Sequence, residues 1–125
     1  MSAWLSAWVA FLGMAGGHGV PADAPCVREP QLEQWLAHQQ SRWVSRLARE
    51  PGYAHPAQVS VCRLRARRPY TDIARGRIFA NALRTENDEV AFIHEYLHLA
   101  LRDHPRSGDE NYIETLAREL AHGAQ

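Results

Sequence analysis

The segment His94-Glu95-Tyr96-Leu97-His98 constrains this chain more than any other, because it sets two imidazoles and a carboxylate on neighbouring positions of one helix. In an α-helix, residues i and i+4 lie one above the other on the same face, so His94 and His98 can both point a ring nitrogen at one metal ion. Glu95 lies about 100° further round the helix, close enough to hold a water molecule beside that ion. The segment therefore predicts a Zn²⁺ site with Glu95 as general base.

The flanking residues favour a helix at this place. Thr85 supplies a hydroxyl N-cap, and acidic side chains follow it in the first turn. An apolar stripe with three- and four-residue steps then runs through Val90, Ile93, Leu97 and Leu101. Because His104 precedes Pro105 and is biased away from helical geometry, we expect the helix to end near Arg102 or Asp103.

A catalytic zinc site needs a third protein ligand and an open fourth position. His104, ten residues after His94, is the expected third ligand. A carboxylate from the following helix is the alternative, and Glu114 and Glu110 lie there. We expect the group that does not bind the metal to orient a ligating histidine by a hydrogen bond.

The N-terminal part of the chain differs in kind from the rest. Residues 3–15 are almost wholly apolar, and no charged side chain precedes Asp23. This length is typical of the apolar region of a signal peptide and is too short for a membrane-spanning helix, although a basic residue near the start is missing. We expect a signal peptide over residues 1–22, a single domain over 23–125, and a periplasmic or secreted protein. If the stretch is instead a buried helix, the protein would be cytoplasmic.

The two cysteines agree with export. Cys26 and Cys62 both fall in the expected mature domain, and an even count in a small exported domain indicates a disulfide. Neither has a second cysteine at metal-site spacing, so we do not expect thiolate ligation of zinc.

The remaining elements follow from periodicity and turn residues. Pro30 can begin a helix that runs to about Arg49. Strands are expected over 58–64 and 77–81, with a turn-rich stretch between them. Ser107 and Glu110 form a potential capping box for a last helix. These elements predict an α+β fold: a small antiparallel sheet with a backing helix, an HExxH active-site helix and a C-terminal helix.

Overall charge gives no indication of a nucleic-acid partner. The formal net charge is zero, so no global field attracts DNA, RNA or an anionic membrane. Arg63, Arg65, Arg67 and Arg68 with Tyr70 make a small basic and aromatic cluster. In a neutral, exported chain we interpret this cluster as a solvated strand edge and loop.

The stretch from Thr85 to Pro105 resembles zincin-type metallopeptidases. Its spacing, HExxHxxxxxH, is similar to that of SprT-like and WLM-type zinc proteases. It differs from metzincins, which place Gly where this chain has Leu101 and carry a Met-turn after the motif. The resemblance implies a minimal zincin-like domain whose edge strand, here 77–81, borders the cleft and can pair with a peptide.

A second resemblance covers more of the chain, from Val61 through the HExxH segment to Glu114. This part is similar to the C-terminal module of an uncharacterised exported bacterial family encoded beside alpha-2-macroglobulin-like proteins. Known members are much longer than this chain. The resemblance implies export and a zinc site, with an alpha-2-macroglobulin-like protein as a potential partner.

We therefore predict an exported zinc metallopeptidase that acts on a peptide or protein substrate. Zn²⁺ would be held by His94, His98 and His104, and Glu95 would move the proton. Tyr112, Tyr70 or Arg77 could serve as a second electrophile. The alternative is a non-enzymatic cell-envelope interaction module in which a structural or vestigial zinc site is closed by Glu114.

Overall fold

The structure of this protein is a computed structural model, and it describes residues 24–123. The expected signal peptide over residues 1–22 lies outside this range. The described elements, in chain order, are α1 (Pro30–Leu47), β3 (Ser60–Arg63), β4 (Tyr70–Asp72), β5 (Arg77–Ala80), α2 (Glu86–Ala100) and α3 (Glu110–Ala121). Three helices and a small sheet confirm the α+β class.

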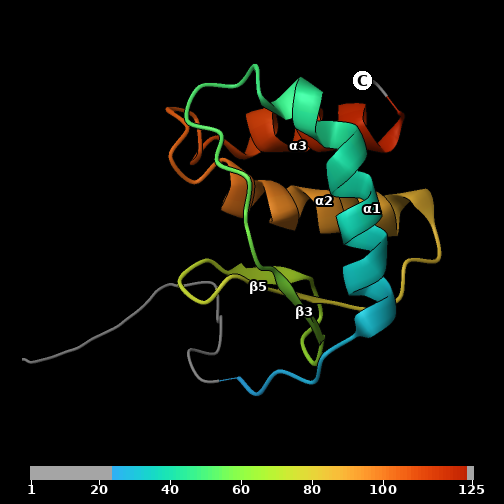
Figure 1. Ribbon diagram of the computed structural model, residues 1–125. Helices are drawn as coiled ribbons and strands as arrows, with labels where there is room; N and C mark the ends of the chain where they lie inside the picture. The colour runs from blue at the N-terminus through green and yellow to red at the C-terminus, as the bar shows by residue number, and fades with distance from the viewer. Residues whose placement is uncertain (1–23, 124–125) are drawn as a thin grey trace, which may run out of the picture.

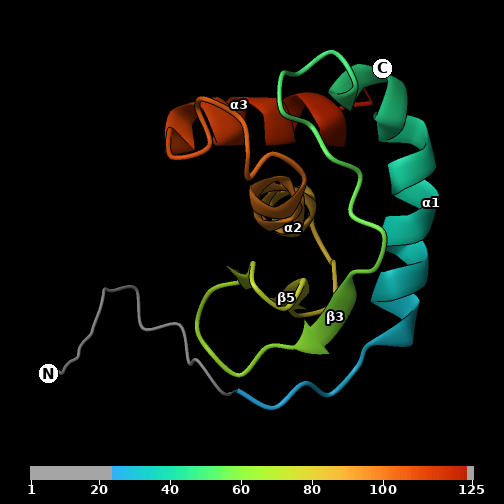
Figure 2. The ribbon, with the colours of Figure 1, turned by 60° about the vertical axis from the view of Figure 1, so that its left-hand side comes forward.

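Helix α2 lies in the middle of the molecule. Figures 1 and 2 show α3 on one side of it and the sheet on the other, while α1 runs along a third side. Aromatic contacts join α1 to α2: the rings of Trp35 and Phe92 lie 5.5 Å apart, and those of Trp43 and Tyr96 lie 5.6 Å apart. Because three of its sides are covered, α2 buries most of its length, at Val90, Phe92, Ile93, Tyr96, Leu97, Leu99 and Ala100.

The caps explain where the helices begin. Helix α2 begins as expected: the Thr85 hydroxyl accepts a hydrogen bond from the backbone N–H of Asp88, and the Asp88 carboxylate accepts one from the N–H of Thr85. The expected cap of α3 was wrong by two residues. Asp109, rather than Ser107, caps that helix, and its carboxylate accepts a hydrogen bond from the N–H of Tyr112.

The sheet is mixed, and this corrects the expectation of an antiparallel one. Strands β3 and β5 agree with the predicted ranges to within two residues, but they pair in parallel, with Val61 opposite Ile78. Strand β4 was not predicted; it pairs with β5 in the antiparallel sense, with Thr71 opposite Ile78. The connection from β3 to β5 crosses over and places β4 on the far side, so the strand order is β3-β5-β4.

This order also changes which strand borders the cleft. The expected edge strand over 77–81 is the central strand β5, whereas β4 lies at the edge. Within residues 24–123, β4 pairs with β5 alone. The strand that faces the HExxH segment is β4, because the Thr71 hydroxyl contacts Glu95.

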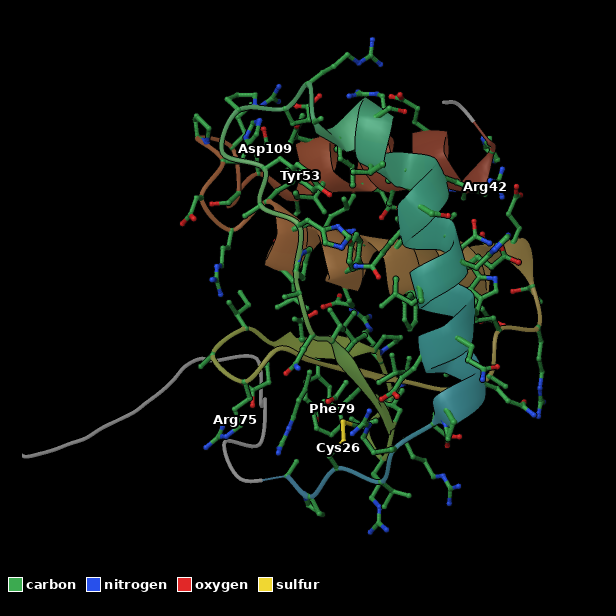
Figure 3. All side chains as sticks on the ribbon, viewed as in Figure 1. Cys26, Arg42, Tyr53, Arg75, Phe79 and Asp109 are labelled. Atoms are coloured by element: carbon green, nitrogen blue, oxygen red, sulfur yellow. A yellow bond between two sulfur atoms is a disulfide. The ribbon has the colours of Figure 1, made fainter. Side chains whose placement is uncertain are left out.

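The two faces of the sheet pack into different apolar clusters. Val61 and Ile78 belong to the main core beneath α2. On the other face, Cys62 and Phe79 form a smaller cluster that Cys26 covers. The expected disulfide between Cys26 and Cys62 is present and closes a separation of 36 residues (Figure 3). It fastens the chain before α1 to strand β3. Within the described part of the chain, no helix is long and apolar enough to cross a membrane.

We expect the disulfide to stabilise the fold by roughly 3–4 kcal/mol, because it restricts a 36-residue loop in the unfolded chain. Replacing both cysteines by serine should lower the denaturation midpoint in urea accordingly. The native protein with a reductant gives the matched control. Equal midpoints for the oxidised, reduced and doubly substituted proteins would contradict this role.

Candidate metal centre

The uncovered side of α2 carries the HExxH residues. The side chains of His94 and His98 are 16% and 19% exposed, and their ring centroids lie 5.0 Å apart. Their positions at i and i+4 place both rings on the side of α2 that borders the start of α3. The helix thus presents two imidazoles at the surface of an otherwise buried element.

Glu110, at the first turn of α3, completes this group. Its Oε1 atom lies 2.7 Å from Nε2 of His94 and 3.3 Å from Nε2 of His98. One ligand atom from each of the three residues lies within 4.8 Å of the other two. The N-terminus of a helix stabilises negative charge, so the start of α3 favours an ionised carboxylate at this position.

Glu114, one turn further along α3, holds the other nitrogen of His94. Its Oε1 atom lies 2.8 Å from Nδ1 of His94, and its Oε2 atom lies 2.9 Å from Nη2 of Arg118. A carboxylate on Nδ1 fixes the orientation of the ring and leaves Nε2 for a metal. Glu114 therefore orients the His94 ring and does not act as a metal ligand in this arrangement.

The pKa of His94 reflects two opposing influences. Burial of the ring lowers its pKa, while the hydrogen bonds to Glu114 and Glu110 raise it and outweigh the burial. In the metal-free protein, the imidazolium can donate to a carboxylate on each side. A metal bound to Nε2 would take the place of one of these protons.

Glu95 is largely buried between α2 and β4. The Thr71 hydroxyl lies 2.8 Å from Oε1 of Glu95 and 2.9 Å from its carbonyl oxygen. Burial raises the pKa of Glu95, while the hydrogen bond from Thr71 and the positive charges of His98 and His94 act against the rise. A carboxylate with a raised pKa suits a group that accepts and returns a proton.

His104 lies elsewhere in the structure, and the geometry does not bring it to His94 and His98. The backbone N–H of Arg106 donates to its Nδ1 atom at 2.8 Å, so its proton is on Nε2. That Nε2 lies 3.3 Å from Oε1 of Glu50 and 3.2 Å from the hydroxyl of Tyr112. Both ring nitrogens are thus engaged, and the side chain is only 5% exposed.

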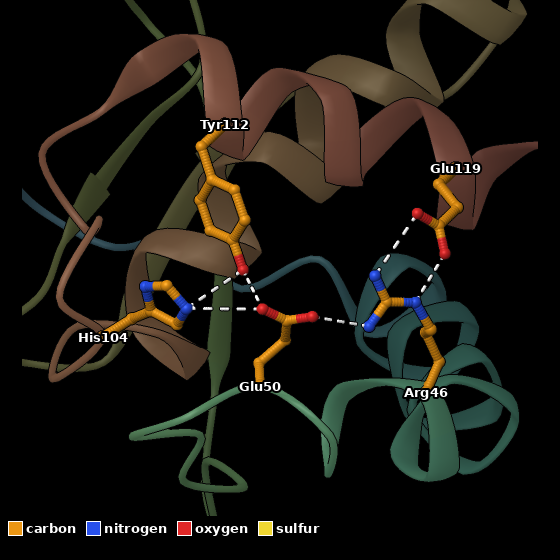
Figure 4. A network of polar contacts seen from close by, with 5 residues as sticks. All are labelled: Arg46, Glu50, His104, Tyr112 and Glu119. Carbon is orange, nitrogen blue, oxygen red and sulfur yellow. Dashed lines mark hydrogen bonds and ion pairs between the residues drawn. The ribbon is translucent and has the colours of Figure 1, made fainter.

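A polar network surrounds His104 (Figure 4). The Tyr112 hydroxyl donates to the Glu50 carboxylate, whose other oxygen lies 2.7 Å from Arg46. Arg46 also reaches Glu119 on α3, at 2.5 Å. The network joins the end of α1 and the loop after α2 to both ends of α3. It therefore fixes how α3 is rotated, and with it the face that carries Glu110 and Glu114.

The loop after α1 approaches this network very closely. Gly52 has a φ of 78°, and a Cβ atom at this position would lie 2.5 Å from the carbonyl oxygen of Asp103. The backbone N–H of Ala54 donates to the carbonyl oxygen of Ala100 at 3.0 Å. A side chain at residue 52 would separate the two segments, so glycine is required here.

A cleft of about 390 Å³ opens beside the HExxH residues. Its floor is the exposed face of α2, and α3 and the segment before β4 form its walls. It is lined by Arg68, Pro69, Asn87, Val90, Ala91, His94, Glu95, Glu114 and Arg118. None of the three expected electrophiles, Tyr70, Arg77 and Tyr112, is among the lining residues. Tyr112 donates to Glu50 instead, and Tyr70 stacks on Phe79.

The donor set suits zinc. Two imidazole nitrogens and one carboxylate oxygen are ligands that Zn²⁺ prefers, and three of them leave a fourth position open. Tetrahedral ligands at ordinary zinc bond lengths lie about 3.3 Å from one another. The observed separations from Glu110 are 2.7 Å to His94, shorter than this value, and 3.3 Å to His98, equal to it. The Glu110 side chain is 65% exposed.

Glu110 and Thr71 are the two site residues that the sequence indicates least. The sequence offers Glu110 only as an alternative ligand and as part of a capping box. Its spacing to Glu114 was the available signal, because residues i and i+4 on α3 face the same neighbour. For Thr71 there was no signal, because the three-residue strand that carries it has no period to detect.

We expect the pKa of His94 to exceed its usual value of 6.5 in the metal-free protein. The protonated ring then contributes stability that is complete below pH 6.5 and is lost as the pH rises through the raised pKa. NMR titration of the His94 imidazole measures this pKa. The double substitution of Glu110 and Glu114 by Gln should lower the value, and Glu89→Gln should leave it unchanged. A pKa at or below 6.5 in the unsubstituted protein would refute this assignment.

Comparisons with known proteins agree with export. A family described as "Predicted secreted protein (DUF2300)" matches residues 13–106. The uncharacterised protein YfaQ of Escherichia coli (strain K12) is 43% identical over 102 residues, which make up 82% of this chain and 18% of YfaQ. The chain thus spans 18% of the length of this curated relative. No solved structure matches the chain.

The family description and the disulfide confirm the expected periplasmic or secreted location. The chain belongs to the DUF2300 family of predicted secreted proteins.

Proposed function

We propose that this protein is a zinc-dependent hydrolase that acts on peptides. The observation that carries the proposal is the convergence of His94, His98 and Glu110, whose ligand atoms all lie within 4.8 Å of one another. Glu95, on the same helical turn as His94, lines the adjoining cleft. Of the three candidate ligands, His94 lines this cleft, and His98 and Glu110 do not. A metal ligand and an acid–base group at the edge of one cleft are what metal-assisted hydrolysis needs.

In this proposal His94 and His98 would hold the metal through Nε2, and Glu110 would hold it through a carboxylate oxygen. Zn²⁺ at this position would polarise a carbonyl group and lower the pKa of a coordinated water to about 7. Glu114 keeps its hydrogen bond to Nδ1 of His94 and holds the ring in place.

Glu95 accepts the proton of the attacking water and passes it to the leaving amine. Its burial against β4 keeps the carboxylate in a restricted position, and the Thr71 hydroxyl holds one of its oxygens. Strand β4 supports a peptide substrate, because an extended chain can add to the edge of a sheet beside the cleft.

The contacts of Glu114 argue against the rival reading, an interaction module with a closed structural zinc site. Such a site needs a fourth protein ligand, and Glu114 is the candidate. Its two oxygens already bind His94 at Nδ1 and Arg118. An open three-ligand site is therefore favoured over a closed one.

The zinc content of the protein and of single-residue variants identifies which residues bind the metal. We expect about one zinc ion per chain in the purified protein, lost in Glu110→Gln and retained in His104→Asn. Glu114→Gln should weaken zinc binding by roughly 10- to 100-fold, because it removes an orienting hydrogen bond. Glu89→Gln, an acid of α2 outside the site, is the matched control.

Absence of zinc from the unsubstituted protein after reconstitution would overturn the proposal. Loss of zinc in His104→Asn alone would restore His104 as the third ligand. Circular dichroism of each variant shows whether the loss of metal reflects loss of the fold.

Glu95→Gln should retain zinc and lose roughly 10²- to 10⁴-fold in peptide hydrolysis, because the amide cannot accept the proton. Mass spectrometry of a peptide mixture incubated with either protein measures the cleavage, and a chelator provides the metal-free control. Undiminished cleavage by Glu95→Gln would sink this mechanism.

An alpha-2-macroglobulin-like partner stays a prediction for this chain. Cross-linking of the purified protein with such a partner, with and without a chelator, would measure an association and its dependence on metal.

A further inference from the structure

We propose that the cleft selects substrates that carry a carboxylate side chain two or three residues from the cleaved bond, and that Arg68 binds this carboxylate. The inference rests on the proposed function and adds a substrate class to it.

The charges that line the cleft leave Arg68 uncompensated. Glu114 forms an ion pair with Arg118 at 2.9 Å and contacts Nδ1 of His94 at 2.8 Å, so its charge is compensated within the cleft. Glu95 is largely buried and hydrogen-bonded to Thr71. Arg68 lines the same cleft with an exposed side chain, and it has no hydrogen bond or ion pair to any residue between 24 and 123. A ligand carboxylate would give it the partner that residues 24–123 do not supply.

The backbone holds Arg68 in a defined place. Arg68 ends a short bend and directly precedes Pro69, whose ring restricts the backbone of the residue before it. Tyr70 follows and stacks on Phe79, with the ring centroids 4.6 Å apart. The next residue, Thr71, contacts Glu95. The cation is thus attached to the same short segment that holds the general base, and the two cannot separate freely.

This attachment sets the distance between the cation and the reacting bond. Arg68 lies three residues before Thr71, so their Cα atoms are at most about 10 Å apart. An extended substrate advances about 3.3 Å per residue. The carboxylate that reaches Arg68 therefore belongs to a residue two or three positions from the bond beside Glu95.

The rest of the lining agrees with a short acidic segment. Val90, Ala91 and Pro69 supply apolar surface for the body of a side chain, and Arg68 supplies the charged end. An arginine guanidinium can bind a carboxylate with two parallel hydrogen bonds, which makes it selective for this group over a neutral amide. A basic side chain at the same position would meet a like charge.

The test uses the full chain loaded with zinc and a peptide mixture that carries Glu, Gln or Lys at equal frequency at every position. Mass spectrometry locates the cleaved bonds and the residues around them. We expect Glu to be preferred over Gln by roughly fivefold at two or three residues from the bond, as for an exposed ion pair. Arg68→Gln should abolish the preference, and Arg68→Glu should shift it toward Lys. Arg65→Gln, an exposed arginine outside the cleft, should keep it.

Cleavage without this preference, or a preference that survives Arg68→Gln, would overturn the inference while leaving the hydrolase proposal intact. If no peptide is cleaved, the hydrolase proposal fails. The role of Arg68 is then tested by measuring how tightly peptides bind. NMR titration of Glu95→Gln with paired Glu and Gln peptides should then show tighter binding of the Glu peptide, lost when Arg68→Gln is added. Equal binding, or none, would overturn it.

Discussion

The burial of α2 on three sides is the constraint from which the rest of this structure follows. The sheet, α1 and α3 each cover one side of the helix, and its apolar residues supply the common core of all three contacts. A helix buried in this way has one face left for polar side chains. His94 and His98 occupy that face, Glu95 lies at its edge against β4, and every group that could assist them must come from an element at its border. Strand β4 contributes Thr71, and α3 contributes Glu110 and Glu114.

The helices could be predicted closely from the sequence, because their signals are local. Thr85 and Pro30 mark helix starts through the chemistry of one turn, and the structure has them as expected. Strand pairing depends on contacts between distant residues, so neither the parallel pairing of β3 with β5 nor the short strand β4 could be deduced. The disulfide could be expected, because only two cysteines were available to pair.

The third ligand shows where sequence spacing stops being informative. His104 follows the HExxH segment at a spacing that suits a ligand, but α2 ends at Ala100 and a turn begins. The backbone N–H of His104 donates to the carbonyl oxygen of Leu101, and this turn directs the ring toward Glu50. The direction of a chain beyond a helix end depends on what packs there. Here the loop at Gly52 packs there, and it lies about 50 residues earlier in the sequence. The same packing brings His104 into contact with Tyr112 of α3. The surroundings of His104 and the position of α3 beside His94 and His98 therefore both depend on the contact between the loop at Gly52 and residue Asp103.

The disulfide has a consequence for the chemistry of the metal centre. Cys26 and Cys62 are the two cysteines of the chain, and both are consumed by the bridge. The candidate donors at His94, His98 and Glu110 are nitrogen and oxygen atoms, which oxidants that form disulfides leave unchanged. Oxidative maturation and metal loading can therefore occur in either order without competing for the same atoms. A thiolate ligand would instead have to be protected from the very conditions that close the bridge.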